Sequence, residues 1–327
     1  MAADTPVLCV RVPREEGERT RSELRERGVV DDAHRIVAEE GAVFVPVTSR
    51  PDGYDTVERP MPAREGQTLP ADLLGFSPSY ERLGDVAIID EDDPERAREI
   101  ADALVACDLP VSSVLNRASE VQGELRVRDW EVLAGDTTTV HREYGFEYAV
   151  ELAAVFFSPR LATERHRVVE QVAPDERVFD MFAGVGPFVI PAAARGAETV
   201  GVDLNERAVE LLRENAERNG VADRVTAVHG DVRELAATGE HDGWATRLVM
   251  NLPHSADDFL DTAVRLAGDR CVLHYYDIQP VEDPFSAGEA AIRAAAEGYD
   301  VTVQRRRRVR SYSPGTENVC LDVLLER

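Results

Sequence analysis

The sequence contains no lysine. All 37 basic residues are therefore arginines, and they are outnumbered by 62 acidic residues, which gives a formal net charge of −25. We interpret this balance as an acidic, lysine-free surface that keeps a halophilic protein soluble in concentrated salt. An ordinary acidic protein encoded by a GC-rich genome is the alternative.

A net negative charge ordinarily argues against nucleic acid as a partner. The argument is weaker here, because counterion release contributes little to affinity at high salt. The arginines are also unevenly spread, since four of them form the run 305–308 and Arg310 follows closely. This run is either the solvated edge of a sheet or a ridge that contacts phosphates.

Cysteine is scarce, and long apolar runs are missing. The four cysteines are Cys9, Cys107, Cys271 and Cys320. They form no CxxC pair and have no histidine at ligand spacing, so we expect no disulfide framework, no metal site and a reducing, cytoplasmic location. No apolar run approaches the roughly eighteen residues that a membrane span needs, so we expect no membrane association.

Turn residues and charges divide the chain into three parts. We predict a small N-terminal α/β domain at 1–60, an intermediate α/β unit at 70–118 and a sheet domain with an N-terminal β extension at 119–327. The stretch 50–66 is rich in proline and glycine among charged residues, which is typical of a linker.

Hydrophobic patterning predicts the elements of these parts. The N-terminal domain should contain strands 7–12 and 42–47 and helices 20–27 and 32–39. The intermediate unit should contain strands 86–90 and 113–116 around helix 94–107. A β meander of strands 123–132, 138–143 and 146–150 should lead into the sheet. Alternation along its first strand would put Arg126 and Arg128 on one face.

The most informative stretch is an apolar strand at 178–182 that runs into a turn containing Gly184 and Gly186. Pro187 then stands where the first position of a helix tolerates proline. A strand, a Gly-x-Gly turn and a helix N-terminus together make a cradle for a nucleotide or nucleoside. The third glycine of the dinucleotide fingerprint is missing, which argues against a dehydrogenase.

Three more predicted strands, 199–203, 225–229 and 247–250, each end at or are closely followed by a polar residue: Asp203, Asp231 and Asn251. With Gly184 these residues should line one carboxyl edge of a parallel sheet, where such sheets bind ligands. Asp203 can accept ribose hydroxyls, and Asp231 can reach an adenine amino group. The set points to S-adenosylmethionine as the ligand. The alternative is that these acids merely cap helices.

The remaining predicted elements are strands 271–276, 301–309 and 319–325 and the helix 285–297. A closing hairpin of this kind is typical of methyltransferase sheets. The predicted fold class is therefore α/β, with a Rossmann-like class I methyltransferase sheet that is parallel except for a final antiparallel strand. A small N-terminal α/β domain and an intermediate α+β unit precede it.

One further segment, 156–165, leads into a helix with Val168, Val169 and Val172 on one side. Ser158 or Thr163 could cap this helix. Glu164 would then lie in its first turn, where an acid stabilises the helix dipole. That structural role is the alternative to a catalytic one.

Six motifs together resemble the archaeal and eukaryotic tRNA (guanine-37-N1)-methyltransferase family. They are FSPRLATER, VFDMFAGVGPF, GVDLN, GDVRE, NLPH and HYY. The resemblance covers about residue 120 to the end, and the N-terminal unit is similar to the small extra domain of archaeal members. It implies transfer of the methyl group of S-adenosylmethionine to N1 of the guanine just 3′ of the anticodon.

The resemblance also implies catalytic roles. Guanine N1 carries a proton, so methylation needs a general base and a positive donor for the charge that builds on O6. Glu164 matches the family's general base. Arg126 is the chosen O6 donor, with Arg128 as the alternative. Asn251 should orient the base edge, and Phe156 stands where the family can carry a tyrosine.

Binding residues follow from the same resemblance. The cofactor would be held by Arg165, Gly184, Gly186, Asp203, Leu204, Asp231, Val232 and Asn251. The RNA would be contacted by Arg128, Arg160, Pro253, Arg306 and Arg308. Residues 1–60 would recognise tRNA away from the anticodon, at the elbow, or would be a packing domain without RNA contact. No obligate protein partner is expected.

Two other functions remain open at this point. A sister enzyme of the tRNA wyosine pathway uses the same cofactor to donate its aminocarboxypropyl group, and its sheet would look alike. The intact Asn251–Leu252–Pro253 favours methyl transfer. A catalytically silent RNA-binding protein on the same scaffold is the other alternative, and the intact set of polar site residues argues against it.

Overall fold

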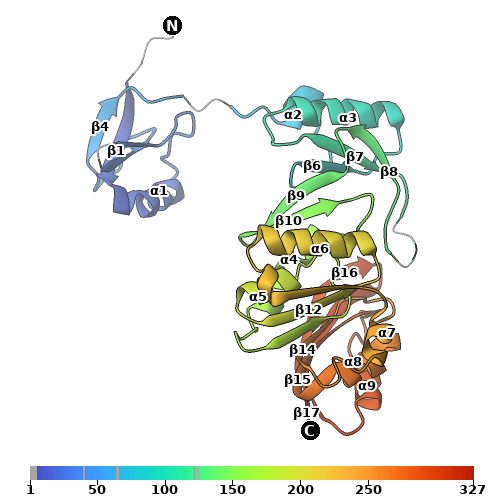
Figure 1. Cartoon of the computed structure of the whole chain (residues 1–327). Helices are drawn as coiled ribbons and strands as arrows, with labels where there is room; N and C mark the ends of the chain where they lie inside the picture. The colour runs from blue at the N-terminus through green and yellow to red at the C-terminus, as the bar shows by residue number, and fades with distance from the viewer. Residues whose placement is uncertain (1–5, 40, 64–65, 121–122, 124) are drawn as a thin grey trace. The chain divides into compact units, whose positions relative to one another are not determined.

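The computed structural model describes residues 6–39, 41–63, 66–120, 123 and 125–327. The chain divides into two compact units, Met1–Thr68 and Leu69–Arg327 (Figure 1). Small parts of the predicted domains, linker and meander lie outside the described residues, namely 1–5, 40, 64–65, 121–122 and 124. No helix among the described residues is long and apolar enough to cross a membrane.

The N-terminal unit is a four-stranded antiparallel sheet with one α-helix. Its elements are β1 (Val7–Pro13), η1 (Arg14–Glu16), α1 (Gly17–Glu26), β2 (Val37–Glu39), β3 (Ala42–Pro46) and β4 (Thr56–Arg59). The strand order is β2-β3-β1-β4. Val10, Leu24 and Val45 are fully buried and form the centre of its small core.

Two predictions for this unit were wrong. The predicted helix 32–39 is absent from the described residues, because the Asp31 carboxylate accepts the N–H of Ala33 at 2.9 Å and closes a turn, after which Val37–Glu39 pairs with β3. The predicted linker contains strand β4, which pairs with β1 from Val7 opposite Arg59. The prolines and glycines of the segment 50–66 lie on either side of this strand, so the overall composition of the segment predicted a linker.

A second sheet follows, in the order β5-β6-β7-β8. Its strands are β5 (Glu81–Leu83), β6 (Val86–Ile89), β7 (Ser113–Arg117) and β8 (Trp130–Ala134), and its helices are α2 (Pro70–Leu74) and α3 (Pro94–Ala106). Asp93 caps α3 by accepting the N–H of Glu95 at 2.9 Å. One face packs on α3 through Ile89, and the other packs through Ile88 on the hairpin of β9 (Thr138–Glu143) and β10 (Phe146–Glu151).

The predicted strand 123–132 was also wrong. Only Trp130–Ala134 is extended there, and it pairs with β7 instead of joining a meander with β9. Arg126 lies in a turn with a φ of 54°, a left-handed conformation that no strand contains. The alternation argument that placed Arg126 and Arg128 on one strand face therefore fails.

The main sheet has seven strands in the order β13-β12-β11-β14-β15-β17-β16. They are β11 (Arg177–Asp180), β12 (Glu198–Asp203), β13 (Val225–His229), β14 (Ala245–Met250), β15 (Ala267–Pro280), β16 (Asp300–Ser313) and β17 (Thr316–Glu326). The pairs among β11 to β15 are parallel, and β17 runs antiparallel between β15 and β16. The predicted sheet and its antiparallel closing strand are confirmed.

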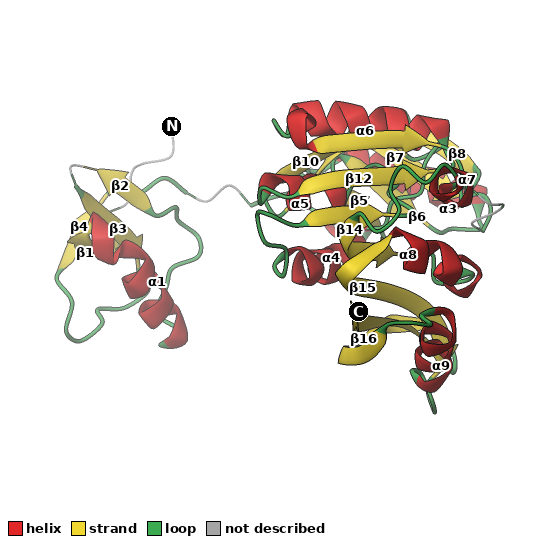
Figure 2. Cartoon of the chain, turned by 60° about the horizontal axis from the view of Figure 1, so that its bottom comes forward, coloured by secondary structure: helices red, strands yellow, loops and turns green. Residues whose placement is uncertain are grey.

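Helices cover both faces of this sheet (Figure 2). One face carries α4 (Ala162–Val169), α5 (Val189–Ala194) and α6 (Glu206–Arg218), and the other carries α7 (Val232–Ala237), α8 (Leu260–Leu266) and α9 (Ser286–Ala295). Short helical turns lie at η2 (Pro159–Leu161), η3 (Ala222–Arg224) and η4 (Ala256–Phe259). Apolar residues on alternate sides of the strands bury both layers, as a parallel sheet requires.

Two local predictions about helix starts were wrong. Pro187 does not open a helix, because α5 begins at Val189 after a longer turn. Within that turn Gly186 has a φ of 94°, and a side chain there would collide with Leu212. At α4 neither Ser158 nor Thr163 acts as a cap, because the turn η2 precedes the helix and no described side chain caps its first turn.

Candidate active site

Strand register places the predicted polar residues along one edge of the main sheet. Asp203 ends β12 opposite His229, and Asn251 directly follows β14. The Asp203 carboxylate accepts the N–H of Gly184 at 2.7 Å and that of Asn205 at 2.9 Å. Burial raises the pKa of Asp203, and those two hydrogen bonds oppose the rise. The glycine turn and the predicted ribose acceptor are therefore brought together.

Beside this pair, Leu204 leaves 45% of its surface exposed, which is unusual for a large apolar residue. Asp231 caps α7 by accepting the N–H of Arg233 at 2.8 Å, and its carboxylate also pairs with the Arg233 side chain, which lowers the pKa of Asp231. Val232 is buried in the core. The helix-cap alternative thus applies to Asp231, both of whose carboxylate oxygens accept hydrogen bonds from Arg233.

Sequence reasoning missed Asp180, the last residue of β11. Its carboxyl group is fully buried, one oxygen accepts the N–H of Phe182 at 3.2 Å, and the other has no partner among the described residues. Burial raises the pKa of Asp180 to about 7, and the charge of Asp203 adds to the rise. An unpartnered buried polar atom is rare in proteins, and a functional site is one reason for it. The acid at the end of the motif strand was the available signal.

Glu164 lies in the first turn of α4 and is only 3% exposed. Its Oε1 accepts hydrogen bonds from Arg167 Nη2 at 2.7 Å and Tyr276 Oη at 3.1 Å. Because Tyr275 of β15 pairs with Met250, Tyr276 is level with Asn251 at the end of the neighbouring strand. Glu164 is therefore held at the same edge of the sheet as the predicted cofactor residues.

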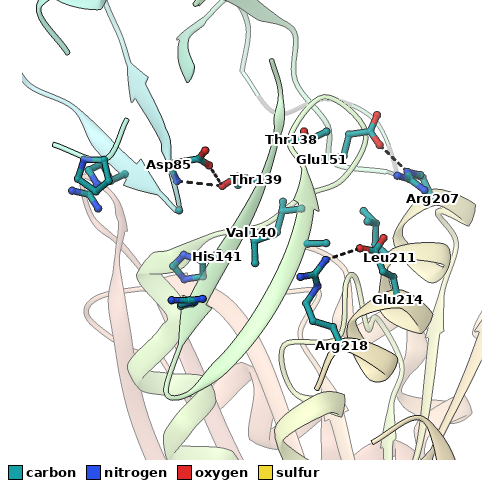
Figure 3. Close-up of a pocket in the computed structure, with 16 residues that line it drawn as sticks. Asp85, Thr138, Thr139, Val140, His141, Glu151, Arg207, Leu211, Glu214 and Arg218 are labelled. Atoms are coloured by element: carbon teal, nitrogen blue, oxygen red, sulfur yellow. Dashed lines mark hydrogen bonds and ion pairs between the residues drawn. The ribbon is translucent and has the colours of Figure 1, made fainter. Parts of the chain in front are cut away.

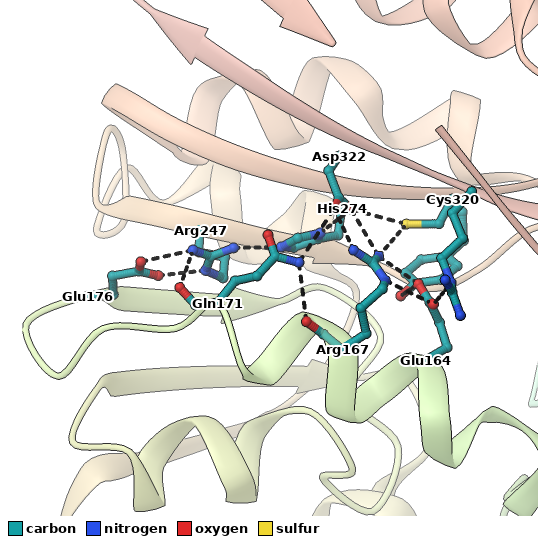
Figure 4. Close-up of polar contacts among 10 residues, drawn as sticks. Glu164, Arg167, Gln171, Glu176, Arg247, His274, Cys320 and Asp322 are labelled. Atoms are coloured by element: carbon teal, nitrogen blue, oxygen red, sulfur yellow. Dashed lines mark hydrogen bonds and ion pairs between the residues drawn. The ribbon is translucent and has the colours of Figure 1, made fainter. Parts of the chain in front are cut away.

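Behind Glu164 runs a chain of buried polar contacts (Figure 4). Arg167 bridges Glu164 and Asp322, and the Asp322 carboxylate also contacts His274 Nδ1 at 2.7 Å. His274 Nε2 meets Arg247 at 2.7 Å. Burial acts to raise the pKa of Asp322, but His274 and Arg167 lower it strongly. His274, Cys320 and Asp322 have metal-ligand atoms within 4.8 Å of one another, yet arginines occupy these atoms and oppose a cation.

The structure places Arg126 beside the NLPH loop and Arg128 elsewhere. The Arg126 guanidinium lies 5.1 Å from the centre of the Phe156 ring. Burial lowers the pKa of Arg126, Tyr312 opposes this effect, and the charge of Arg310 adds to it. Tyr312 Oη lies 3.1 Å from His254 of the loop, whose pKa is lowered by burial and by Arg126. This cluster combines a cation with exposed rings.

Arg128 lies 5.4 Å over Trp130, and its neighbouring charges, Arg117 and Asp90 among them, belong to the second sheet. Pro253 in the NLPH loop is buried, as expected of a residue that stiffens it. Of the two predicted O6 donors, Arg126 is thus the one whose side chain lies close to that loop.

Arg165 is paired away from the glycine turn. Its guanidinium donates to Glu143 at 2.5 and 2.9 Å and to the Ser158 carbonyl at 3.0 Å, and it is 3% exposed. It lines a cavity of about 200 Å³ together with Pro187. Arg165 therefore fixes the β9–β10 hairpin to α4 and approaches the glycine turn only through that cavity.

Three of the four predicted RNA-binding arginines, Arg160, Arg306 and Arg308, are exposed but paired. Arg160 pairs with Glu81 at 3.0 Å, Arg306 with Glu289 at 2.5 Å and Arg308 with Glu317 at 2.9 Å. Arg307 points differently, since its Nε lies 2.6 Å from Glu164. The run 305–308 is thus part of an edge strand whose side chains contact helices on both faces of the sheet, α9 through Arg306 and α4 through Arg307.

A cavity of about 840 Å³ lies between the β9–β10 hairpin, α6 and the β5–β6 turn (Figure 3). None of the predicted site residues lines it. Charged side chains around it pair with each other, as Arg207 does with Glu151 at 2.7 Å and Arg218 with Glu214 at 3.0 Å. Gly184, Asp203 and Asn251 lie at the edge of the main sheet instead.

A parallel sheet with an antiparallel closing strand, a glycine turn and a carboxylate ending the second strand defines a class I S-adenosylmethionine-dependent methyltransferase. The chain belongs to the TRM5/TYW2 methyltransferase family, whose domain it matches over 139–304. It also matches the tRNA methyltransferase 5 N-terminal domain over 9–55 and the TYW2 N-terminal domain over 66–138. The predicted family, fold class, enzyme class and cofactor are confirmed.

Individual relatives agree with this assignment. The tRNA (guanine(37)-N(1))-methyltransferase Trm5b of Pyrococcus abyssi is 37% identical over 96% of this chain and 98% of its own. Its crystal structure has a TM-score of 0.69 at 36% identity, covering 98% of this chain and 100% of that one. A structure of aTrm5 with tRNALeu has a TM-score of 0.70 at 30% identity, with the same coverage.

An aminocarboxypropyltransferase is also similar. The tRNA(Phe) (4-demethylwyosine(37)-C(7)) aminocarboxypropyltransferase of Pyrococcus horikoshii is 34% identical over 78% of this chain and 92% of its own.

Proposed function

We propose that this enzyme transfers the methyl group of S-adenosylmethionine to N1 of guanine 37 in tRNA. The observation that carries the proposal is the extent of similarity. The Trm5b relative matches 96% of the chain, whereas the aminocarboxypropyltransferase matches 78%. The N-terminal unit, which contains the match at 9–55, is the part that favours methyl transfer. Such an enzyme would act in the cytoplasm without an obligate protein partner.

Glu164 is the proposed general base. Its carboxylate is buried, oriented by two neighbouring side chains and level with Asn251. One of its oxygens would accept the N1 proton, so that the N1 electron pair attacks the methyl carbon. The carbon–sulfur bond would break as the N–C bond forms, and the sulfur would leave as a neutral thioether. When bound, the sulfonium of the cofactor supplies an already activated methyl group.

Arg126 is the proposed donor to guanine O6. A guanidinium is always charged and offers donors in a fixed plane, which suits an oxygen that gains negative charge. Burial next to Phe156 removes competing water and strengthens that interaction. Asn251 would orient the base edge through its amide, and Phe156 would stack on the base in place of a tyrosine.

The cofactor would lie along the sheet edge. Asp203 would accept the ribose hydroxyls, Leu204 would cover one side of the adenine, and Asp231 with the Val232 backbone would meet its polar edge. The unpartnered oxygen of Asp180 and the turn of Gly184 and Gly186 fit the polar methionine portion.

The target base lies in a tRNA loop, so it must leave its stack to enter the site. The N-terminal unit would recognise tRNA at the elbow, and the arginines Arg128, Arg160, Arg306 and Arg308 would contact the RNA. Arg160, Arg306 and Arg308 would then give up their glutamate partners and bind phosphates of the RNA. The predicted contact from Pro253 does not fit its burial, and this residue would instead stiffen the NLPH loop.

The deciding experiment is incubation with labelled cofactor and unmodified tRNA, followed by nucleoside mass analysis. The expected product is 1-methylguanosine at position 37. An aminocarboxypropyl adduct would establish the wyosine-pathway activity instead. Retention of label in the cofactor, with tRNA still bound, would identify a silent RNA-binding protein.

A further inference from the structure

The carboxylate oxygens of Glu164 contact three side chains, which leave no position free for the proton of guanine N1. Arg167 donates to both of its oxygens, Tyr276 donates to Oε1, and Arg307 Nε lies 2.6 Å from Oε2. A carboxylate offers about four acceptor positions. A guanine N1–H therefore finds no open position until one partner moves.

Two of these partners are held firmly in place. Arg167 is 11% exposed and also donates to Asp322 at 2.5 and 3.0 Å. Asp322 is in turn fixed by His274. Tyr276 is only 1% exposed and packs among core residues. Moving either side chain would leave buried polar groups without partners, which is energetically unfavourable.

Arg307 is the partner that can leave. Its side chain is 38% exposed on the edge strand β16, the most exposed of the three groups around Glu164. Its Nε is close to Glu164 but not aligned as a hydrogen bond, and it has no acceptor among the described residues. An oxyanion would offer this donor the aligned acceptor that it lacks.

Arg307 also differs from its neighbours in direction. Arg306 pairs with Glu289 of α9, on the face opposite α4, and Arg308 pairs with Glu317 of β17. The edge strand thus presents exposed arginines on either side of Arg307, the residue of this run that contacts Glu164. A phosphate backbone that follows this strand would meet Arg307 directly.

We propose that Arg307 is a gate that couples RNA binding to exposure of the general base. Without RNA it covers Oε2 of Glu164, and a backbone phosphate of the bound loop draws it away. Removal of one neighbouring cation makes a carboxylate a better proton acceptor. The proton transfer then occurs only when RNA is in place. This inference rests on the proposed role of Glu164.

The test compares R307Q with E164Q and with R270Q as a matched control. Arg270 is an exposed arginine that pairs with Glu326 near the other end of the strands. Single-turnover rates are measured at saturating cofactor and RNA, with anticodon stem-loops in which each loop phosphate is replaced in turn by a neutral methylphosphonate. KM for RNA is measured across a salt series.

For R307Q we expect an unchanged saturating rate on the all-phosphate stem-loop and a KM raised about tenfold, as for loss of one hydrogen bond to a charged group. The slope of log KM against log salt should fall by about 1. One methylphosphonate should slow the saturating rate of the native enzyme and of R270Q but not that of R307Q.

Two results would overturn the gate alone. One is that E164Q is inactive while R307Q loses its saturating rate on every RNA, because Arg307 would then only position Glu164. The other is that no methylphosphonate distinguishes R307Q from the native enzyme. An E164Q variant with the native rate would refute the base assignment itself and the gate with it. Circular dichroism and cofactor binding confirm that each variant is folded.

Discussion

The Asp203 carboxylate accepts the backbone N–H of Gly184 at 2.7 Å. This contact ties the end of β12 to the glycine turn that follows β11. A second hydrogen bond, from Asn205, fixes the same carboxylate at the start of α6. One side chain therefore joins the glycine turn to the start of α6.

Replacing Asp203 with alanine should weaken S-adenosylmethionine binding by at least about tenfold, because a hydrogen bond to a charged group contributes about 1.5–3 kcal/mol. Isothermal titration calorimetry measures the change. The matched control is D269N, an exposed aspartate that pairs with Arg327. Equal cofactor affinity for D203A and the native enzyme would refute the ribose role.

Replacing Asp180 with asparagine should stabilise the protein at neutral and alkaline pH. The folded-state pKa of about 7 lies above the value of 3.8 for a free aspartate, so the folded state binds the extra proton. Stability of the native protein therefore falls as pH rises from about 4 to 7 and then levels off. The melting-temperature advantage of D180N should grow over that window and stay constant above it.

A constant difference between D180N and the native protein from pH 4 to 9 would contradict this account of Asp180. The same variant should bind the cofactor less tightly, since asparagine keeps the shape but removes the carboxylate charge that we propose to face the methionine portion. Calorimetry at pH 8 separates that effect from stability.

Replacing Arg126 with glutamine should lower the saturating methylation rate about a hundredfold, the usual cost of removing one donor to a developing negative charge. R128Q should leave that rate close to native, because Arg128 stacks on Trp130 away from the NLPH loop. Single-turnover assays on a stem-loop provide the comparison. A larger loss in R128Q than in R126Q would reverse the assignment.

Removing residues 1–68 should mainly raise KM for whole tRNA. That unit is compact by itself, and the remaining unit retains its own cores. Steady-state assays should show the full-length and truncated enzymes to be alike on an isolated anticodon stem-loop. A similar loss on both substrates would rule out recognition of the elbow by this unit.

Added salt should stabilise the protein. With a net charge of −25, like charges repel in the folded state, and raising KCl from about 0.1 M to about 1 M shortens the screening length from about 10 Å to about 3 Å. The melting temperature should therefore rise across this range. A falling melting temperature would show that screening of the many arginine–carboxylate pairs dominates, as in a protein not adapted to salt.

Sequence alone determined the parallel strands β11 to β14, because they are short and bounded by turns, and parallel strands must end at a common edge. The order of motifs was enough to place Gly184, Asp203 and Asn251 there. Sequence reasoning underestimated β15, β16 and β17, which extend beyond the predicted 271–276, 301–309 and 319–325 because they pair with one another along their length. It failed at 32–39, at the strand Thr56–Arg59 and at 123–132, where pairing partners distant in sequence decide the local structure.

Only the tertiary structure decided which acidic residue each arginine of the run 305–308 contacts. Along the run 305–308 all four residues are chemically identical, and their roles depend on the face of the strand and on which acid packs opposite. The buried chain from Glu164 through Arg167 to Asp322 joins residues more than 150 positions apart, a contact that no local pattern encodes. Local periodicity determines where helices and strands form, whereas long-range packing determines which charged side chains from different elements form ion pairs.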